Sequence, residues 1–416
     1  MKALMLAHSN GGGGAGRAAG RLFTALDGAG VDVSMHVDFN DTDDPRVFRN
    51  SGPFADAARR MRITMDEIPA VLARHPQPQL FSPGFSSAIT ARRIDAFQAD
   101  VVNVHWTNFG YLSIKQLGRI RTPLAWTLHD MWALTGGCNY DDESLQARWR
   151  NGFTAAKPDG MRWDVERWVW GRKTQSWTSA RHLITPSTWL AQLASHSEVV
   201  ADWPVHVIPN ALDTHAFSPG DSAAARLRFG IDPAARVALV ALGGDLADPR
   251  KGLDLLRDAL TRMGDTNDEH PFELMVVGRG TAPDGWGAGL PRTHWLGFVD
   301  DDAIVDAYRA ADVVVVPSRQ DNLPQTATEP HACGTPVVAF RIGGLPDIVD
   351  DRVTGYLAAP GDSQDLANGI TWVLADEARR ASLGAAARQR ALDLWDARIV
   401  GAAHARLFAE IAQDRH

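Results

Sequence analysis

Cysteine and excess positive charge are both scarce in this chain. Of its 416 residues only two are cysteines, Cys138 and Cys333, and they lie far apart in the sequence. Two distant thiols supply neither a disulfide framework nor the paired spacing of a structural zinc site, so we expect a reducing compartment, the cytoplasm. The formal net charge of -8 argues against broad nucleic-acid binding, because such binding depends on releasing counterions at a positive surface.

Long hydrophobic runs are also missing. The opening stretch "MKALMLAHSNGGGG" has too short an apolar run for a secretory signal. No window reaches the apolar length of a membrane span. We therefore expect at most a peripheral contact with the inner face of the cytoplasmic membrane. The length of 416 residues exceeds what one core supports, so we expect two domains.

Short apolar runs alternate with helical patterns in both halves of the chain. They occupy residues 2–8, 31–37, 99–106, 123–130 and 182–187, and then 236–244, 272–278, 293–299, 312–318 and 335–340. Continuous apolar strands separated by helices are typical of parallel sheets covered on both faces. We predict an α/β fold of two doubly wound, Rossmann-like domains. Because ligands bind beyond the carboxyl ends of such strands, we expect the two domains to face a common cleft.

The predicted boundaries follow from composition. The first domain is expected to cover residues 1–202. Residues 203–220 contain three prolines among turn residues and are predicted to be the linker. The second domain is expected over residues 221–394, and a last helix within 395–416 is expected to return to the first domain.

A glycine-rich loop, "SNGGGGAGRAAG", separates the first predicted strand from a helix. Gly11, Gly13 and Gly16 satisfy the G-x-G-x-x-G pattern, and Asp38 ends the second strand where a dinucleotide fold places its ribose-binding acid. The same glycines could simply allow close packing of the helix on the strand. A loop without side chains at a helix N-terminus also lets an anionic group approach the backbone amides. The residues alone leave these three interpretations open.

The second half contains two further chemical signals. Arg250 and Lys251 follow a strand at the start of a helix, where two cations suit a diphosphate, although a solvated basic pair is the common alternative. In "SRQDNLPQTATEPHACGTPVVAF", Asp321 follows a strand and Glu329 lies eight positions later in a predicted helix. Pro324 suits the first helical position. A carboxylate at position 329 could accept both hydrogens of a ribose diol; the alternatives are a turn cap and a solvated helix acid.

These motifs resemble a known family. The D-x7-E arrangement of Asp321 and Glu329 looks like the E-x7-E signature of family-4 retaining glycosyltransferases, which have the GT-B fold. "GGGGAGRAAGRL", "NVHWTNFGYLSI", "AWTLHDMWALTGGC", "VIPNALD", "DPRKGLDLL", "WLGFVDD" and "ADVVVVPS" occur in the order of that family. The "HDMW…TGGC" run resembles the branch that builds exopolysaccharides and lipopolysaccharides, such as colanic-acid-type transferases.

The resemblance implies a role for each matching residue of the second domain. Glu329 would bind the donor ribose, and Asp321 would address the hydroxyls of the transferred sugar. The donor diphosphate would contact the side chains of Lys251 and Arg250. The backbone amides of Gln325 and Thr326 would also bind the diphosphate. The backbone of Phe298 and Val299 would contact the nucleobase.

In the first domain, which the resemblance makes the acceptor side, His129 would reach the donor sugar. Gly13 and Gly14 would face the sugar and the diphosphate. The implied reaction transfers a sugar from a nucleoside-diphosphate sugar to a glycan or lipid-linked acceptor, with retention of anomeric configuration and without a metal or another cofactor.

Four positions depart from the family pattern. Asp321 is one methylene shorter than glutamate. Gly244 stands where many members carry an arginine, Ala211 stands where glycine usually follows Asn210, and Pro330 interrupts the predicted helix. The competing hypotheses are a nicotinamide-dependent oxidoreductase, a non-catalytic sugar-nucleotide binder and a GT-B epimerase.

Two segments of the first domain are open to more than one interpretation. The tryptophans of residues 139–177 are candidates for stacking on acceptor sugars or for ordinary burial: Trp149, Trp163, Trp168, Trp170 and Trp177. Residues 54–75 form a basic, moderately amphipathic pattern that fits either an anionic lipid surface or a solvated helix.

Overall fold

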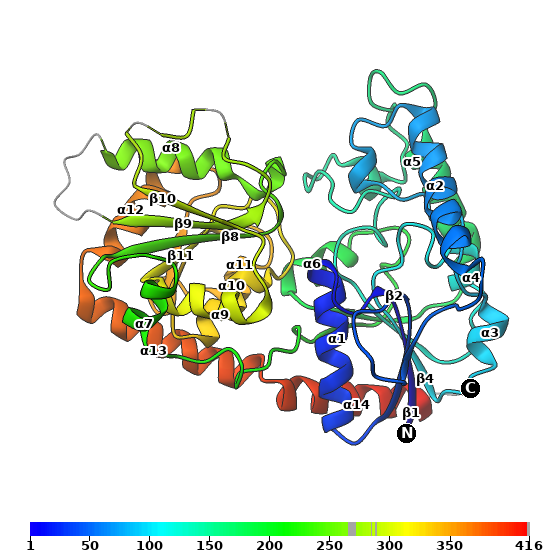
Figure 1. Ribbon diagram of the computed structural model, residues 1–416. Coiled ribbons are helices and arrows are strands. Elements are labelled where there is room, and N and C mark those ends of the chain that lie inside the picture. The colour runs from blue at the N-terminus through cyan, green and yellow to red at the C-terminus, as the bar shows by residue number, and fades with distance from the viewer. Residues whose placement is uncertain (265–271, 284, 288, 414–416) are drawn as a thin grey trace. The chain divides into compact units, whose positions relative to one another are not determined.

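The computed structural model describes residues 1–264, 272–283, 285–287 and 289–413. The chain divides into two compact units. Unit 1 is Met1–Ala211 together with the last helix from Val400 onward, and unit 2 is Leu212–Ile399 (Figure 1). Within the described residues, no helix is long and apolar enough to cross a membrane.

Unit 1 is built on a seven-stranded parallel sheet of order β3-β2-β1-β4-β5-β6-β7. Its strands are β1 (Lys2–Ser9), β2 (Asp32–Phe39), β3 (Val47–Phe48), β4 (Val101–Val104), β5 (Leu124–Thr127), β6 (His182–Thr185) and β7 (Val205–Val207). The apolar residues of β1, β4 and β5 are almost fully buried, which explains their continuous hydrophobic character in the sequence.

The helices of unit 1 are α1 (Gly13–Gly28), α2 (Ala55–Ala73), α3 (Ala91–Asp95), α4 (Ile114–Leu117), α5 (Val165–Ser176), α6 (Thr188–Ala194) and most of α14 (Ala397–Gln413), with short 3-10 turns η1 (Pro78–Leu80) and η2 (Arg148–Asn151). Helix α14 approaches α1 closely: a Cβ atom at Gly401 would lie 2.3 Å from the carbonyl oxygen of Ala25. The last helix therefore packs on the helix that follows β1, and a glycine permits that packing.

Unit 2 has a six-stranded parallel sheet of order β10-β9-β8-β11-β12-β13. The strands are β8 (Val237–Asp245), β9 (Glu273–Arg279), β10 (Thr293–Gly297), β11 (Val313–Val316), β12 (Val337–Phe340) and β13 (Gly355–Ala358). The helices are α7 (Ser222–Arg228), α8 (Leu253–Gly264), α9 (Asp301–Ala310), α10 (Gln325–Ala332), α11 (Leu345–Ile348), α12 (Ser363–Leu374) and α13 (Glu377–Leu394), with the 3-10 turn η3 (Pro249–Lys251).

Strand β8 shows why these runs are apolar at every position. Val237 and Leu239 belong to one buried cluster, whereas Ala238 and Val240 belong to another. Because successive side chains of a strand point to opposite faces, both faces of the sheet are covered.

Each sheet reverses its strand order at its first strand. In unit 1, β1 lies between β2 and β4; in unit 2, β8 lies between β9 and β11. Such a switch point opens a crevice beyond the carboxyl ends of the two central strands. The glycine loop follows β1, the Arg250–Lys251 pair follows β8, and Asp321 follows β11. The chain order of the motifs thus places them at the two switch points.

The predicted fold class, two Rossmann-like parallel domains, is confirmed. The structure differs at residues 203–220, which are not simply a linker. Val205–Val207 forms β7 at the edge of the first sheet, and the units divide after Ala211. Pro204 is compatible with this edge strand because it contributes its carbonyl oxygen, which accepts the amide of Leu183 at 2.8 Å.

Candidate active site

Two separate segments of unit 2 meet in an ion cluster at the β8/β11 switch point. The Nζ atom of Lys251 donates a hydrogen bond to Oδ2 of Asp321 at 2.6 Å. A guanidinium nitrogen of Arg250 lies 3.6 Å from the same oxygen and donates to the carbonyl of Gln320 at 3.0 Å. Arg250, Lys251 and Asp321 therefore form one ion cluster, although Lys251 and Asp321 are seventy positions apart in the sequence.

Asp321 is only 7% exposed. Burial by itself raises the pKa of this carboxyl group, but the charges of Lys251 and Arg250, with hydrogen bonds from Lys251 and the Asn322 amide, bring the pKa below its ordinary value. Asp321 is thus ionised at neutral pH. Its Oδ1 accepts the Asn322 amide at 3.1 Å, so both oxygens take part in the cluster, and a contact with a sugar hydroxyl stays a prediction.

Two glycines allow the backbone to approach closely at this cluster. Gly252 has φ +68°, and a Cβ atom there would lie 1.9 Å from the carbonyl oxygen of Pro317. Gly343 has φ +53°, and its Cβ atom would lie 1.9 Å from the carbonyl oxygen of Asp321. Sequence reasoning did not single out either glycine. Their positions could have indicated them: Gly252 directly follows Lys251, and Gly343 lies in the "RIGG" stretch that follows β12.

Helix α10 begins one residue later than predicted. Pro324 has φ -65° and ψ 125°, so it is the N-cap residue and Gln325 is the first helical residue. The amides of Ala327 and Thr328 donate to the Pro324 carbonyl at 3.0 and 3.3 Å, which places Gln325 and Thr326 in the first turn, at the positive end of the helix. Pro330 does not end the helix, which continues to Ala332.

Glu329 lies on α10 and is 1% exposed. Its Oε2 atom accepts a hydrogen bond from the hydroxyl of Tyr308, on α9, at 2.8 Å. A buried carboxylate needs such a partner, because an unpaired buried charge is costly. Tyr308 was not identified from the sequence. The proposed ribose contact of Glu329 stays a prediction.

The segment after β10 is open to solvent. Phe298 is 60% exposed, and the Arg279 guanidinium lies 4.8 Å from the centre of its ring. A Cβ atom at Gly244 would meet nothing within 4 Å. A cavity of about 610 Å³ lies elsewhere in unit 2, beyond the ends of β8 and β9, and its lining includes Asp248, Trp286 and Arg319.

The glycine loop of unit 1 combines packing with open space. The hydroxyl oxygen of Ser9 accepts the amides of Gly11 and Gly12 at 3.2 and 2.8 Å. A Cβ atom at Gly20 would lie 2.2 Å from the Asn10 carbonyl oxygen, which makes that glycine a packing residue. By contrast, Cβ atoms at Gly13 and Gly14 would meet nothing within 4 Å. Gly13 and Gly14 therefore form the open part of the loop. These are the two residues that the family resemblance assigns to the sugar and the diphosphate.

His129, just beyond β5, is linked through His105 to Asn103 by hydrogen bonds. The Asn103 amide nitrogen donates to the Ala125 carbonyl and the Thr127 hydroxyl, so its Oδ1 atom is the acceptor for His105 Nε2 at 2.7 Å. His105 Nδ1 lies 2.9 Å from His129 Nε2. With both rings neutral, His105 carries its proton on Nε2 and accepts through Nδ1. His129 then carries its proton on Nε2, and its Nδ1 atom is the unprotonated nitrogen.

Burial keeps both rings neutral. It lowers the pKa of His129 to about 4. For His105, burial is again the main cause, aided by the neighbouring His129 and His404, and the pKa falls well below its ordinary value. His129 is thus a neutral hydrogen-bonding group at pH 7.

Comparison with known families connects these observations. Residues 12–216 match the family described as Glycosyltransferase Family 4, and residues 237–376 match the one described as Glycosyl transferases group 1. Both halves of the chain therefore match glycosyltransferase family models. The first match contains Gly13, Gly14 and His129, and the second contains the cluster at Lys251 and Asp321.

Curated relatives of this chain include proteins named D-inositol 3-phosphate glycosyltransferase. That of Geodermatophilus obscurus is 39% identical over 201 residues, which are 44% of this chain and 43% of the relative. That of Saccharomonospora viridis is 29% identical over 352 residues, 78% of this chain and 76% of the relative. The chain thus spans less than half the length of the first of these relatives.

Solved structures agree on the fold. A sucrose-phosphate synthase from Thermosynechococcus elongatus gives a TM-score of 0.68 at 20% identity, covering 99% of both chains. WaaG, a glycosyltransferase involved in lipopolysaccharide biosynthesis, gives 0.62 at 16% identity, covering 98% of this chain and 99% of its own. The fold of the chain is GT-B.

The nicotinamide hypothesis is not favoured. Asp38, its candidate ribose-binding acid, is 3% exposed and pairs with the Arg62 guanidinium at 2.9 Å. The carboxylate is engaged inside unit 1.

The tryptophans of residues 139–177 are mainly structural. Trp149 and Trp177 are buried, and their indole nitrogens donate to the carbonyls of Asp142 and Ile114. Trp168 and Trp170 pack partly buried against the same core. Of the five, Trp163 is the one counted among the exposed large side chains.

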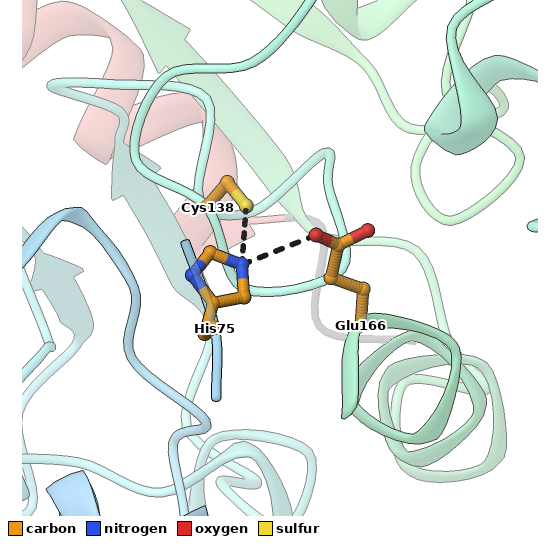
Figure 2. A group of neighbouring side chains, drawn as sticks. All are labelled: His75, Cys138 and Glu166. Atoms are coloured by element: carbon orange, nitrogen blue, oxygen red, sulfur yellow. Dashed lines mark hydrogen bonds and ion pairs between the residues drawn. The ribbon is translucent and has the colours of Figure 1, made fainter. Parts of the chain in front are cut away.

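His75, Cys138 and Glu166 form a buried group whose side-chain atoms lie within 4.8 Å of one another (Figure 2). The donor types could suit a metal ion. However, His75 Nδ1 accepts the Gln77 amide at 3.2 Å, so Nε2 carries the proton and donates to Glu166 at 3.1 Å. Burial raises the pKa of the Cys138 thiol well above its ordinary value. The other Glu166 oxygen pairs with Arg148. This arrangement fits a hydrogen-bonded structural group better than a metal centre.

Proposed function

We propose that this glycosyltransferase moves a sugar from a nucleoside-diphosphate sugar to an acceptor hydroxyl, with retention of anomeric configuration. The cluster of Arg250, Lys251 and Asp321 at the β8/β11 switch point carries the proposal. Two cations and the positive end of α10, at Gln325 and Thr326, offer complementary charge to a diphosphate.

The proposed chemistry depends on a stable leaving group. As the bond between the anomeric carbon and the diphosphate oxygen breaks, positive charge develops on the sugar and negative charge on the diphosphate. Lys251 and Arg250 would stabilise that negative charge. The acceptor hydroxyl would attack from the same face and pass its proton to the departing diphosphate. This scheme requires neither a metal nor another cofactor.

The two remaining side chains would orient the sugar. Asp321 holds Lys251 in place and would address a sugar hydroxyl. His129, which is neutral, would contact another hydroxyl. Gly13 and Gly14 leave room for the donor beside α1. Neither Asp321 nor His129 is assigned the role of a nucleophile.

Relatives and neighbours suggest which substrates to test first. The fold neighbour HepE of Anabaena was solved with UDP and with UDP-glucose, which makes UDP-sugars the first donors. The names of the curated relatives make a phosphorylated inositol the first acceptor. The "HDMW…TGGC" resemblance makes a glycan or lipid-linked saccharide of exopolysaccharide or lipopolysaccharide synthesis the second.

Calorimetry with UDP-, GDP- and ADP-sugars and NAD, followed by product analysis, tests the proposal. We expect one nucleotide sugar to bind without added metal, NAD not to bind, and a retained glycoside to form only with an acceptor. Lys251→Met should weaken donor binding. Turnover that EDTA abolishes and magnesium restores would refute the metal-free mechanism, and sugar isomerisation without an acceptor would indicate an epimerase. Donor binding that yields no product with any acceptor would indicate a non-catalytic binder.

Glu329→Ala tests the ribose assignment separately. A ribose contact is present in both the donor and the free nucleotide, so both affinities should fall by about 1.5–3 kcal/mol. Tyr308→Phe is the control for the internal hydrogen bond. An unchanged nucleotide affinity in a folded Glu329→Ala variant would show that the carboxylate serves Tyr308 instead.

A further inference from the structure

Helix α2 presents an apolar face to solvent. Phe54, Met61, Met65, Ile68 and Leu72 are 79%, 60%, 41%, 46% and 57% exposed. They recur at intervals of seven, four, three and four residues, which places them on one side of the helix. We call these five residues the outer stripe. At 1.5 Å per residue the stripe is about 27 Å long.

The opposite face of α2 holds small apolar and polar residues: its buried side chains are Asp66, Ala70 and Ala73. Asp66 is 1% exposed, and its carboxylate accepts the Ser82 hydroxyl and the Phe85 amide, both at 2.7 Å. Arg62, also on this side, pairs with Asp38. A helix at the surface of a soluble domain normally buries its apolar side. On α2 only the small Ala70 and Ala73 enter the core, whereas the large apolar side chains face solvent, so burial within unit 1 does not account for the outer stripe.

The surroundings of the outer stripe carry aromatic and basic groups. The Ala73 carbonyl accepts the Arg162 amide at 2.9 Å, so exposed Trp163 lies next to the end of α2. Figure 1 shows α2 next to α5, with which it is in contact. Exposed arginines outnumber exposed acids here: Arg60, Arg74, Arg162 and Arg167 stand against Glu67, Asp159 and the ion-paired Asp56. This region is locally basic, although the chain has a net charge of -8.

A second copy of the chain is the obvious competing partner, because the spacing of the stripe also fits the seam of a coiled coil. A seam is normally flanked by charged residues that pair across the helices. Here the flanking positions 57, 64 and 71 hold alanine, threonine and valine. The flanking positions on the other side of the stripe, 62 and 69, hold Arg62, which is already paired with Asp38, and Pro69. The exposed Val71 also makes the apolar face wider than a seam. These features favour a lipid surface.

We propose that the outer stripe of α2 rests in the boundary between headgroups and acyl chains of an anionic bilayer, with the helix axis parallel to the membrane. The apolar side chains would enter the acyl region, Trp163 would lie at the interface, and the arginines would contact anionic headgroups. This inference does not depend on the transferase reaction, because lipid binding is measured without substrates.

Vesicle sedimentation with the full chain tests the proposal. We expect the protein to bind vesicles that contain phosphatidylglycerol and to bind phosphatidylcholine alone weakly, with affinity falling as salt rises. Met61→Gln, Ile68→Gln and Leu72→Gln together should lower the partition coefficient by about tenfold or more. Leu227→Gln with Val353→Gln is the matched control, since both residues are exposed and lie in unit 2. This pair should leave binding unchanged.

The thermal midpoint and nucleotide affinity confirm that each variant is folded. Three outcomes would overturn the proposal: no binding of the wild-type chain to anionic vesicles, equal binding of the triple variant, or equal losses in the control. Light scattering measures whether the chain forms a dimer, which is the competing explanation of the outer stripe. A dimer that the triple variant dissociates, without vesicle binding by the wild type, would assign the outer stripe to a second copy of the chain.

Discussion

At the scale of single residues, Asp321 connects the basic pair to the loop beyond β11. Its Oδ2 atom accepts a hydrogen bond from Lys251 Nζ at 2.6 Å, and its backbone carbonyl accepts one from the Gly344 amide at 3.1 Å. The shorter side chain, compared with the glutamate of the family pattern, is therefore sufficient to reach the cation. What the sequence suggested as a sugar-facing acid is also the anchor of the proposed diphosphate site.

Asp321→Asn separates these two roles. If the carboxylate orients the sugar, turnover with the full donor should fall by about tenfold or more, because orientation matters most as the bond breaks. Affinity for the free nucleoside diphosphate should stay nearly unchanged, since an amide still accepts a hydrogen bond from Lys251. Calorimetry and steady-state kinetics on the same preparation measure both quantities.

Asp321→Glu, which restores the residue of the family pattern, is the control and should keep activity. Lost nucleotide affinity in Asp321→Asn, with normal turnover of bound donor, would assign Asp321 to the nucleotide site or to the turn alone.

Asn103 is predicted to act through His105 on the tautomer of His129. Asn103→Leu removes the acceptor for His105 Nε2, so either nitrogen of His105 can carry the proton and His129 can take the opposite tautomer. We expect a lower kcat with little change in nucleotide affinity, whereas Thr127→Val, which removes a different partner of Asn103, should have a smaller effect. If both variants lowered kcat equally and unfolded at the same lower temperature, Asn103 would have only a structural role.

At the scale of elements, the turn from β8 into α8 depends on one glycine and tolerates change at another. Gly252→Ala should be destabilising by about 2 kcal/mol or more, because φ is +68° and the new methyl group would meet the Pro317 carbonyl. Gly244→Ala is the matched control, with open space and an expected change within about 0.5 kcal/mol. Chemical denaturation measures both, and equal losses would show that the backbone relaxes at Gly252.

Helix α10 shows how an element can be predicted while its register is missed. The sequence predicted a helix after β11, but Pro324 caps it and Gln325 starts it. Proline suits both positions, and only its ψ of 125° decides between them. Pro330 was expected to disturb the helix, yet α10 is short enough that one missing amide leaves the segment helical as far as Ala332.

At the scale of the molecule, buried histidines predict acid sensitivity of unit 1. Burial is the main cause that lowers the pKa of His8, His36, His129 and His404 to about 4, from 6.5. Below pH 6.5 the unfolded chain binds these protons and the folded unit does not. Stability is therefore present above pH 6.5 and is lost as the pH falls toward 4, by about 1.4 kcal/mol per pH unit for each histidine. Asp141 offsets part of this loss, because burial raises its pKa to about 6.

Denaturant unfolding between pH 7 and pH 5 measures that slope. His404→Leu should reduce the slope of unit 1 by about one histidine's contribution, about 1.4 kcal/mol per pH unit. His215→Asn, at an exposed position of unit 2, should leave the slope as it is. A slope that His404→Leu does not change would show that other groups dominate the acid transition.

The sequence by itself determined the class of fold and the positions of the chemical motifs. Runs such as "DVVVVP" are apolar at consecutive positions because both faces of a parallel sheet are buried, and chain order alone then places the glycine loop, Lys251 and Asp321 at strand ends. The ion pair between Lys251 and Asp321, the partner Tyr308 of Glu329 and the hydrogen-bond chain behind His129 appeared only in the tertiary structure, because each joins segments distant in sequence. The same holds for α2: its pattern predicted an amphipathic helix, but only packing decided that the face with Asp66, Ala70 and Ala73 turns inward and the stripe of large apolar side chains outward.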